Sequence, residues 1–151
     1  MIHLSSYLAD ALLATGSLKS LLDTGKIYIY SGPVPSSAVP ADGAIDPSCV
    51  LLDTITAAAG AGLTFNGAPV NGVLQKTSTE TWSGVAGAAG TATFFRFCVG
   101  TDNGSAAAAA GNYRVQGTVG TDASFDMVFT SATIAVSDTK TLNTFQLYLP
   151  L

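Results

Sequence analysis

Short apolar runs with a two-residue period constrain this chain more than any other feature. From Lys26 onward, apolar and polar residues alternate in these runs, and clusters of Gly, Ser, Thr and Asn separate them. This period is typical of β-strands, because successive side chains point to opposite faces. No helix-length segment lies between the runs, which excludes parallel βαβ winding and leaves a sandwich, a jelly roll or a barrel. We predict an all-β fold: an antiparallel β-sandwich, jelly-roll-like, with a short N-terminal helical segment.

The first 25 residues follow a different period. Apolar residues recur there at the i, i+3, i+4 spacing of one helix face: Leu4, Tyr7, Leu8, Ala11 and Leu12. Ser5 or Ser6 can cap the start of this helix, and Ser17 can cap a second short turn. We interpret residues 1–25 as an N-terminal helical arm and residues 26–151 as the β-sandwich, within a single globular domain. The apolar face of the arm either packs on the core or docks on another subunit.

Several strands and turns stand out in the β region. The run Lys26–Tyr30 is apolar on both faces, which suits a strand buried on two sides. Thr91–Val99 is the clearest strand, with Phe95 and Phe97 on one face. Asn66–Gly67 is a hairpin-type dipeptide, and Asp102–Gly104 is predicted to be a turn. The stretch from Gly32 to Pro47 holds four of the six prolines, so it is a long loop or arm instead of a central strand.

The charged residues are few and scattered. Six Lys and Arg and ten Asp and Glu give a net charge of -4, and the chain has a single histidine, His3. The absence of a basic cluster argues against nucleic acid and anionic lipid as partners. Because titratable groups are scarce and no metal or nucleophile motif is present, we expect no enzyme, no metal and no cofactor. Low surface charge also suits a protein whose surface is covered by neighbouring subunits.

The remaining candidates for chemistry have structural alternatives. Glu80 or Asp126 is expected to pair with Arg96 or Arg114 across strands. Aromatic side chains could form a platform for a sugar, although aromatic residues in alternating strands are usually core; these are Trp82, Tyr113 and Tyr148. Tyr148 is expected to be the exception that contacts a neighbour.

The two cysteines lie in predicted strands. Cys49 and Cys98 form one disulfide or remain buried thiols, and the thiols are favoured because the sequence indicates a cytosolic origin. The segment Met1–Gly16 has no basic region and carries an acidic residue, so we expect no signal peptide. No apolar run is long enough for a membrane span.

Four segments together resemble a known family: Leu8–Lys19, Lys26–Pro33, the stretch from Gly72 to Gly84, and Val115–Gly120. Similar segments occur in small structural proteins of tailed bacteriophages and prophages. The resemblance implies a capsid cement, or decoration, protein that sits on the outside of the head and bridges major capsid proteins. The implied partners are the major capsid protein and copies of the chain itself, as a dimer or trimer, without nucleic acid, membrane or small-molecule substrate.

A cement protein acts through contact area, so its functional residues are those at its interfaces with neighbouring subunits. Extended arms are expected to supply them: Leu4, Tyr7, Leu8 and Leu12 in the N-terminal segment, Pro33, Pro35 and Pro40 in the proline-rich segment, and Tyr148 and Leu151 in the tail. Two alternatives remain open. One is a tail tube or connector-type virion protein, and the other is a carbohydrate-binding adhesin module.

Overall fold

The structure, a computed structural model, describes residues 1–148. Strands make up 35% of the chain and helices 11%, and the sheets are antiparallel. The one exception among the described residues is a short parallel pairing, in which Val119 and Gly120 lie beside Met127 and Val128. The predicted all-β sandwich with a short N-terminal helical segment is confirmed. The jelly-roll topology is not established by the strand order and stays a prediction.

The elements divide the described chain as follows. In chain order they are β1 (His3–Leu4), α1 (Ser6–Ala14), α2 (Leu18–Leu22), β2 (Lys26–Ser31), β3 (Val50–Ile55), a 3-10 turn η1 (Ala58–Gly60), β4 (Val73–Gln75), β5 (Trp82–Val85), β6 (Gly90–Thr91), β7 (Phe94–Cys98), β8 (Arg114–Gly120), β9 (Met127–Val128), β10 (Thr133–Ile134), β11 (Thr139–Leu142) and β12 (Gln146–Tyr148).

The N-terminal helices begin where the serines predict, and a short strand that the sequence pattern does not predict precedes them. Ser5 caps α1, because its side chain accepts a hydrogen bond from the amide of Leu8. Ser17 caps α2 in a reciprocal capping box with Ser20. Leu4 does not belong to the helix as predicted. Its backbone is in β1, opposite Val115 of β8, so the chain enters the large sheet before the helix starts.

One layer of the sandwich is a sheet with the order β1-β8-β7-β2-β3, to which β9 adds along β8. The alternation predicted for its central strands is correct. Ile27, Phe95, Phe97 and Val115 lie in the core, whereas Phe94 stacks on Tyr30 with ring centroids 5.2 Å apart. The sheet is therefore buried on both faces, as the doubly apolar Lys26–Tyr30 run indicates.

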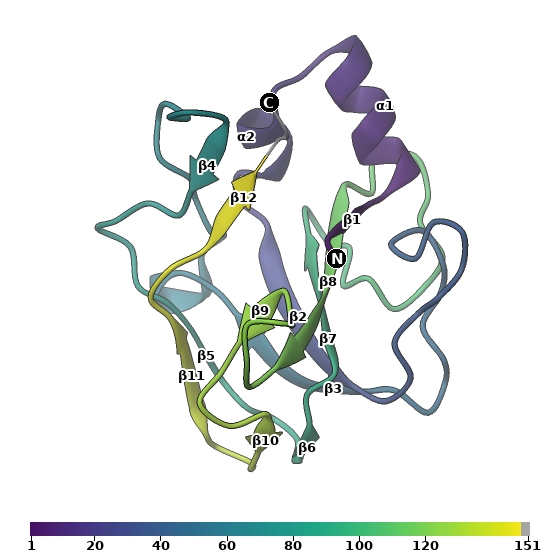
Figure 1. The fold of residues 1–151 in the computed structure, drawn as a ribbon, viewed down its shortest axis with the longest axis vertical. Helices are drawn as coiled ribbons and strands as arrows, with labels where there is room; N and C mark the ends of the chain where they lie inside the picture. The colour runs from purple at the N-terminus through teal and green to yellow at the C-terminus, as the bar shows by residue number, and fades with distance from the viewer. Residues whose placement is uncertain (149–151) are drawn as a thin grey trace.

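The other layer is a long two-stranded ribbon in which residues 73–92 run antiparallel to residues 132–148 (Figure 1). Its three paired parts are β4 with β12, β5 with β11, and β6 with β10. Between the first two parts, residues 77–81 lie opposite the shorter segment 143–144, so one strand bulges. The ribbon is thereby a single element that covers the inner face of the large sheet.

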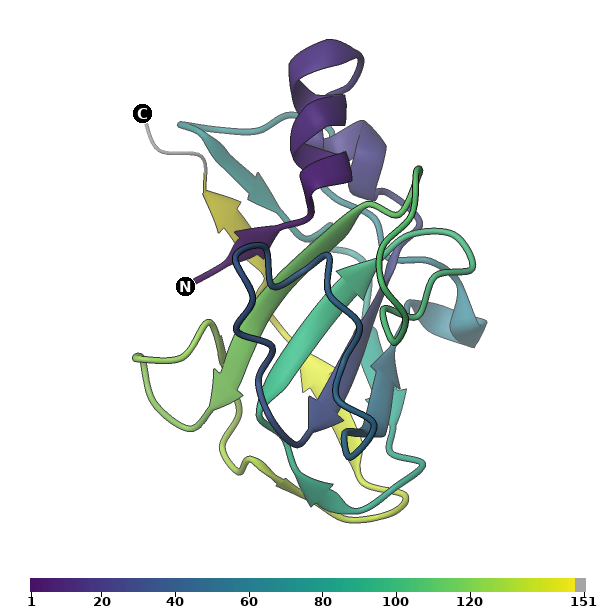
Figure 2. The same ribbon diagram turned by 90° about the vertical axis from the view of Figure 1, so that its right-hand side faces the viewer.

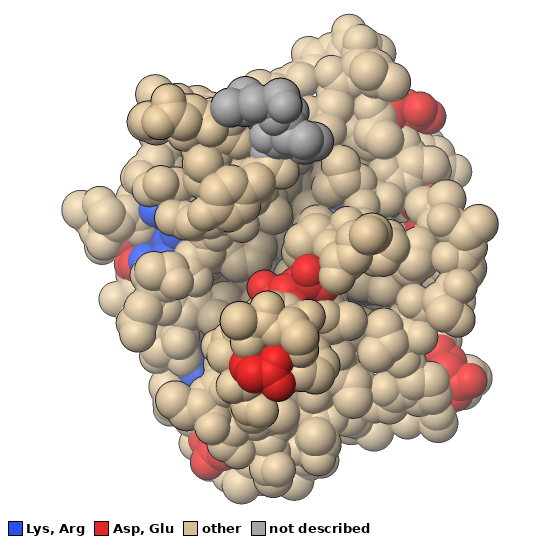
Figure 3. Space-filling model, viewed as in Figure 1, with Lys and Arg blue, Asp and Glu red and all other residues tan. Residues whose placement is uncertain are grey.

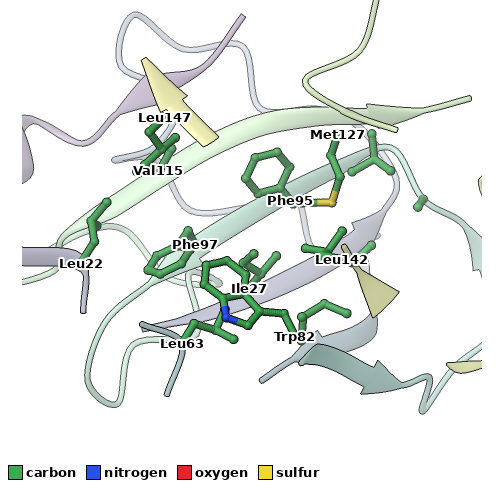
Figure 4. Close-up of a cluster of buried hydrophobic side chains, with 14 of the residues drawn as sticks. Leu22, Ile27, Leu63, Trp82, Phe95, Phe97, Val115, Met127, Leu142 and Leu147 are labelled. Carbon is green, nitrogen blue, oxygen red and sulfur yellow. The ribbon is translucent and has the colours of Figure 1, made fainter. Parts of the chain in front are cut away.

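The core lies between the two layers and extends beneath the helices (Figure 4). Trp82 of the ribbon packs edge-on against Phe65, with ring centroids 5.5 Å apart. Leu8 of α1 and Leu22 of α2 are fully buried in the same cluster. The helices therefore close one end of the sandwich and are part of its hydrophobic core.

Two local predictions fail for identifiable reasons. The tight two-residue turn is formed by Asn71–Gly72 and not by Asn66–Gly67: the backbone groups of Val70 and Val73 exchange two hydrogen bonds across it. Both turn residues have positive φ, 51° and 75°, as a type I′ hairpin needs. In the sequence, Phe125 and Met127 alternate with polar residues, which predicts that they share one strand face. Phe125 is instead exposed, because regular strand begins only at Met127.

Candidate functional site

A buried polar layer covers the outer face of the large sheet. Arg114 of β8 is almost fully buried and binds Asp102 through two atoms, Nε to Oδ2 at 2.5 Å and Nη2 to Oδ1 at 2.8 Å. This bidentate pair satisfies both charges away from water. Asp102 lies in the predicted Asp102–Gly104 turn, where it also accepts a hydrogen bond from the Gly104 amide.

Arg96 of β7 lies in the same layer without a carboxylate partner. Its guanidinium donates to Gln116 Oε1 at 2.8 Å, to the carbonyl of Pro40 at 2.8 Å and to the carbonyl of Gly104. Burial and the neighbouring Arg114 lower the pKa of Arg96. The side chain therefore acts as a connector between backbone carbonyls of two loops.

These side chains hold the proline-rich segment, which crosses in front of β8, β7 and β2 (Figure 2). Arg114 donates to the Ala41 carbonyl at 3.3 Å, and Gln116 donates to the Pro35 carbonyl at 3.4 Å. The Asp42 carboxylate accepts from the Ser6 amide at the start of α1. The segment from Pro35 to Asp42 is thus anchored to the sheet and to the helix.

The predicted pairing of Glu80 and Asp126 with arginines is wrong. Glu80 accepts hydrogen bonds from the Thr64 amide and from Trp82 Nε1 at 2.6 Å. Asp126 binds the N-terminal amine at 2.8 Å and the amide of Thr118. Both arginines are already held by loop carbonyls, and by Asp102 in the case of Arg114, so they are not available to these acids.

The described residues 1–148 contain no group of three or more His, Cys, Asp or Glu that could hold a metal ion. Burial pushes the pKa of Glu80 upward, but its hydrogen bonds outweigh this effect and lower the pKa below the ordinary value.

Cys49 and Cys98 are free thiols. Burial raises the pKa of Cys98 to about 12, so this thiol stays protonated and unreactive. No helix in the described part is long and apolar enough to cross a membrane.

The three aromatic residues do not form a sugar platform. Trp82 is fully buried in the core, and Tyr113 packs partly buried against it. Tyr148 is 67% exposed, and its contact with a neighbour stays a prediction. A face for stacking a sugar needs exposed rings, and within residues 1–148 these three do not provide one.

The predicted interface residues divide by exposure. Leu8 and Pro40 are buried within the protomer, which removes them from any docking surface. Half-buried positions are Leu4, Tyr7, Leu12 and Pro35, and exposed positions are Pro33 and Tyr148. Leu151 lies outside the described residues. Sequence reasoning missed Leu13, whose side chain is 89% exposed on α1, because it lies off the apolar helix face.

Apolar surface is present at several further places. A cavity of about 490 Å³ opens between the helices and the end of the ribbon, with a lining that includes Leu12, Leu18, Pro69, Leu74 and Leu147. Large apolar side chains that are more than half exposed occur on several elements: Met1, Leu13, Val70, Val85, Val128, Val136 and Tyr148. Charged side chains are sparse on the face in Figure 3.

No family model, no curated protein and no solved structure matches this chain.

Proposed function

We propose that this chain is a structural virion protein of the capsid cement type, which binds the outside of a tailed-phage head and bridges major capsid proteins. The observation that carries the proposal is the surface: large apolar side chains, such as Leu13 and Tyr148, are exposed among few charges. Apolar surface of this kind favours contact with other proteins. The four sequence segments that resemble tailed-phage structural proteins favour a phage head as the assembly to which it binds.

The anchored proline-rich segment supports the same proposal. Arg96, Arg114 and Gln116 fix its carbonyls, while Pro33 and Val34 remain exposed at its start. A segment that is ordered before it binds loses less conformational entropy on docking. It is therefore suited to bridging two subunits of a fixed lattice.

Binding to heads tests the proposal directly. Purified protein is mixed with heads of the phage that encodes it, prepared from a deletion strain that lacks this chain, and the bound fraction is measured by sedimentation. The protein should saturate the heads and raise the temperature at which they release DNA. The double variant L13S/Y148S should bind about tenfold or more weakly, whereas the control T121S, at an exposed polar position, should bind normally.

The alternatives give different results. A protein that forms rings or tubes without heads is a tail tube or connector protein. A protein that ignores heads and binds immobilised glycans is an adhesin module. Either result contradicts the cement proposal.

A further inference from the structure

The strand 132–148 forms an open edge of the ribbon. In an antiparallel ladder, residues alternate between pairs whose backbone groups face each other and pairs whose backbone groups point apart. Ser83 exchanges two backbone hydrogen bonds with Thr56, at 2.9 and 3.0 Å. The backbone groups of Ser83 therefore point away from β11, and those of its register partner Thr141 point to the opposite, outer side.

The same reasoning applies to β12. The Asn66 amide donates to the Gln75 carbonyl at 2.8 Å, so Gln75 also faces away from its register partner, Gln146. By the two-residue period, Thr139 and Tyr148 point outward as well. The backbone groups of these outward residues have no hydrogen-bond partner within residues 1–148.

This edge is accessible. The four outward residues are exposed, and two adjoining hollows of about 440 and 340 Å³ run beside them, with Val128, Leu142 and Thr144 in both linings. The edge of β3, by contrast, is partly covered, because the Leu52 carbonyl accepts from the amides of Gly87 and Ala88. An accessible edge of unpaired backbone groups is a template for another strand.

The charged residues near this edge indicate which kind of strand can pair with it. The chain carries a net charge of -4, so two copies repel each other over most of their surfaces. The charged side chains beside this edge are, however, Asp126, which lines one of the hollows, and Asp138 and Lys140. Asp126 is paired with the N-terminal amine at 2.8 Å, and the charged atoms of Asp138 and Lys140 lie 3.8 Å apart. Two copies can therefore approach along this edge without like-charge repulsion.

We propose that a second copy of this chain pairs with the edge β11–β12, antiparallel and about a two-fold axis beside Asn143 and Thr144. This register places Thr141 opposite Gln146 of the second copy, and Thr139 opposite Tyr148. Residues whose backbone groups point outward in one copy then lie opposite residues of the same kind in the other copy. Every pairing therefore occurs twice, as a two-fold interface requires. The pairing goes beyond the proposed function, because it needs no capsid.

Proline at an outward position tests the pairing. The substitution T141P removes an amide that points away from the ribbon and leaves the inward ladder intact, whereas T141V keeps the amide and serves as the matched control. Sedimentation velocity over a range of concentrations measures the dimer. We expect wild type and T141V to dimerise, and T141P to dimerise about tenfold or more weakly, since the symmetric interface loses two hydrogen bonds.

A wild type that stays monomeric, or a T141P variant that dimerises as wild type does, overturns the proposal. If T141P fails to fold by circular dichroism, Q146P decides in its place, and wild-type amide exchange decides independently: the Thr139, Thr141 and Gln146 amides must gain protection as concentration rises. Protection that arises only on heads assigns the edge to a strand of another protein and also overturns the proposal. Dimerisation is measured without heads, so its failure leaves the head-binding test unaffected.

Discussion

At the scale of single residues, Asp53 of β3 is the group least satisfied by its surroundings. Its side chain is buried, and neither carboxylate oxygen has a hydrogen-bond partner within residues 1–148. Gly84 of the ribbon packs so closely that a Cβ there would lie 2.2 Å from Asp53 Oδ1. Burial raises the pKa of Asp53 to about 6, an effect that the nearby backbone amide of Thr54 and, less strongly, the charge of Lys140 on β11 partly offset.

This carboxyl should make stability depend on pH. Its pKa is about 6 in the folded chain against an ordinary 3.8, so the folded state holds the proton more tightly between these values. The stabilisation that this residue contributes is therefore complete below pH 4 and is lost as the pH rises through 6. At pH 7 the free energy of unfolding is lower than at pH 4 by on the order of 3 kcal/mol. The variant D53N cannot titrate, so its free energy of unfolding should exceed that of wild type by an amount that grows from pH 4 to pH 7.

Urea denaturation across this pH range measures the difference. The variant D10N, which changes an exposed acid, is the control and should run parallel to wild type. If the D53N curve also runs parallel to wild type, the carboxyl is solvated or paired and this account of Asp53 is incorrect.

The bidentate pair of Asp102 and Arg114 gives a second residue-level prediction. The substitution D102N leaves two buried guanidinium groups, Arg96 and Arg114, without a carboxylate. Removing one partner of a buried ion pair typically costs 3–5 kcal/mol. We expect a loss of about that size in urea denaturation, together with faster proteolysis within the segment Gly32–Pro47 that the arginines hold. A loss below about 1 kcal/mol would indicate that water solvates the pair.

At the scale of elements, α1 belongs to the core through one face and is exposed on the other. Leu8 is fully buried, whereas the side chain of Leu13, on the same helix, is 89% exposed. The variant L8A should therefore lose about 2–5 kcal/mol of unfolding free energy. The matched variant L13A should change it by less than about 0.5 kcal/mol. Similar effects of the two substitutions would show that the helix does not pack on the sandwich as described.

The strand pattern was predictable because alternation is a local property of the sequence. The period of two identified the β fold, and capping serines located both helices, Ser5 for α1 and Ser17 for α2. The burial of Arg96 and Arg114 was not predictable in this way, because it depends on a loop more than 50 positions away in sequence, from Arg96 Nη2 to the Pro40 carbonyl. The only local signal was the polar alternation in β8 opposite an apolar core face.

The interface candidates show the same limit. Helical spacing grouped Leu8 with Leu12 but could not distinguish the core from a docking surface, since both require apolar side chains. Tyr148 was correctly expected to be exposed because it alternates with core positions. The open edge of β11–β12 could not be found from sequence, because it depends on which strands pair and which do not.

At the scale of the whole molecule, the proposed function depends on the exposed surface. The arginine layer fixes the loops on one face of the large sheet, and the ribbon closes the other. The described residues outside these layers present apolar side chains and few charges. Such a molecule is suited to filling positions in a repeating assembly, where many modest interfaces act together.

Electron cryomicroscopy of heads with and without this chain tests that claim most directly. We expect density for the β-sandwich on the outer face of the shell, between capsid subunits, and no such density on heads of the deletion strain. Density for the chain in the tail, or heads that are identical in the two preparations, would contradict it.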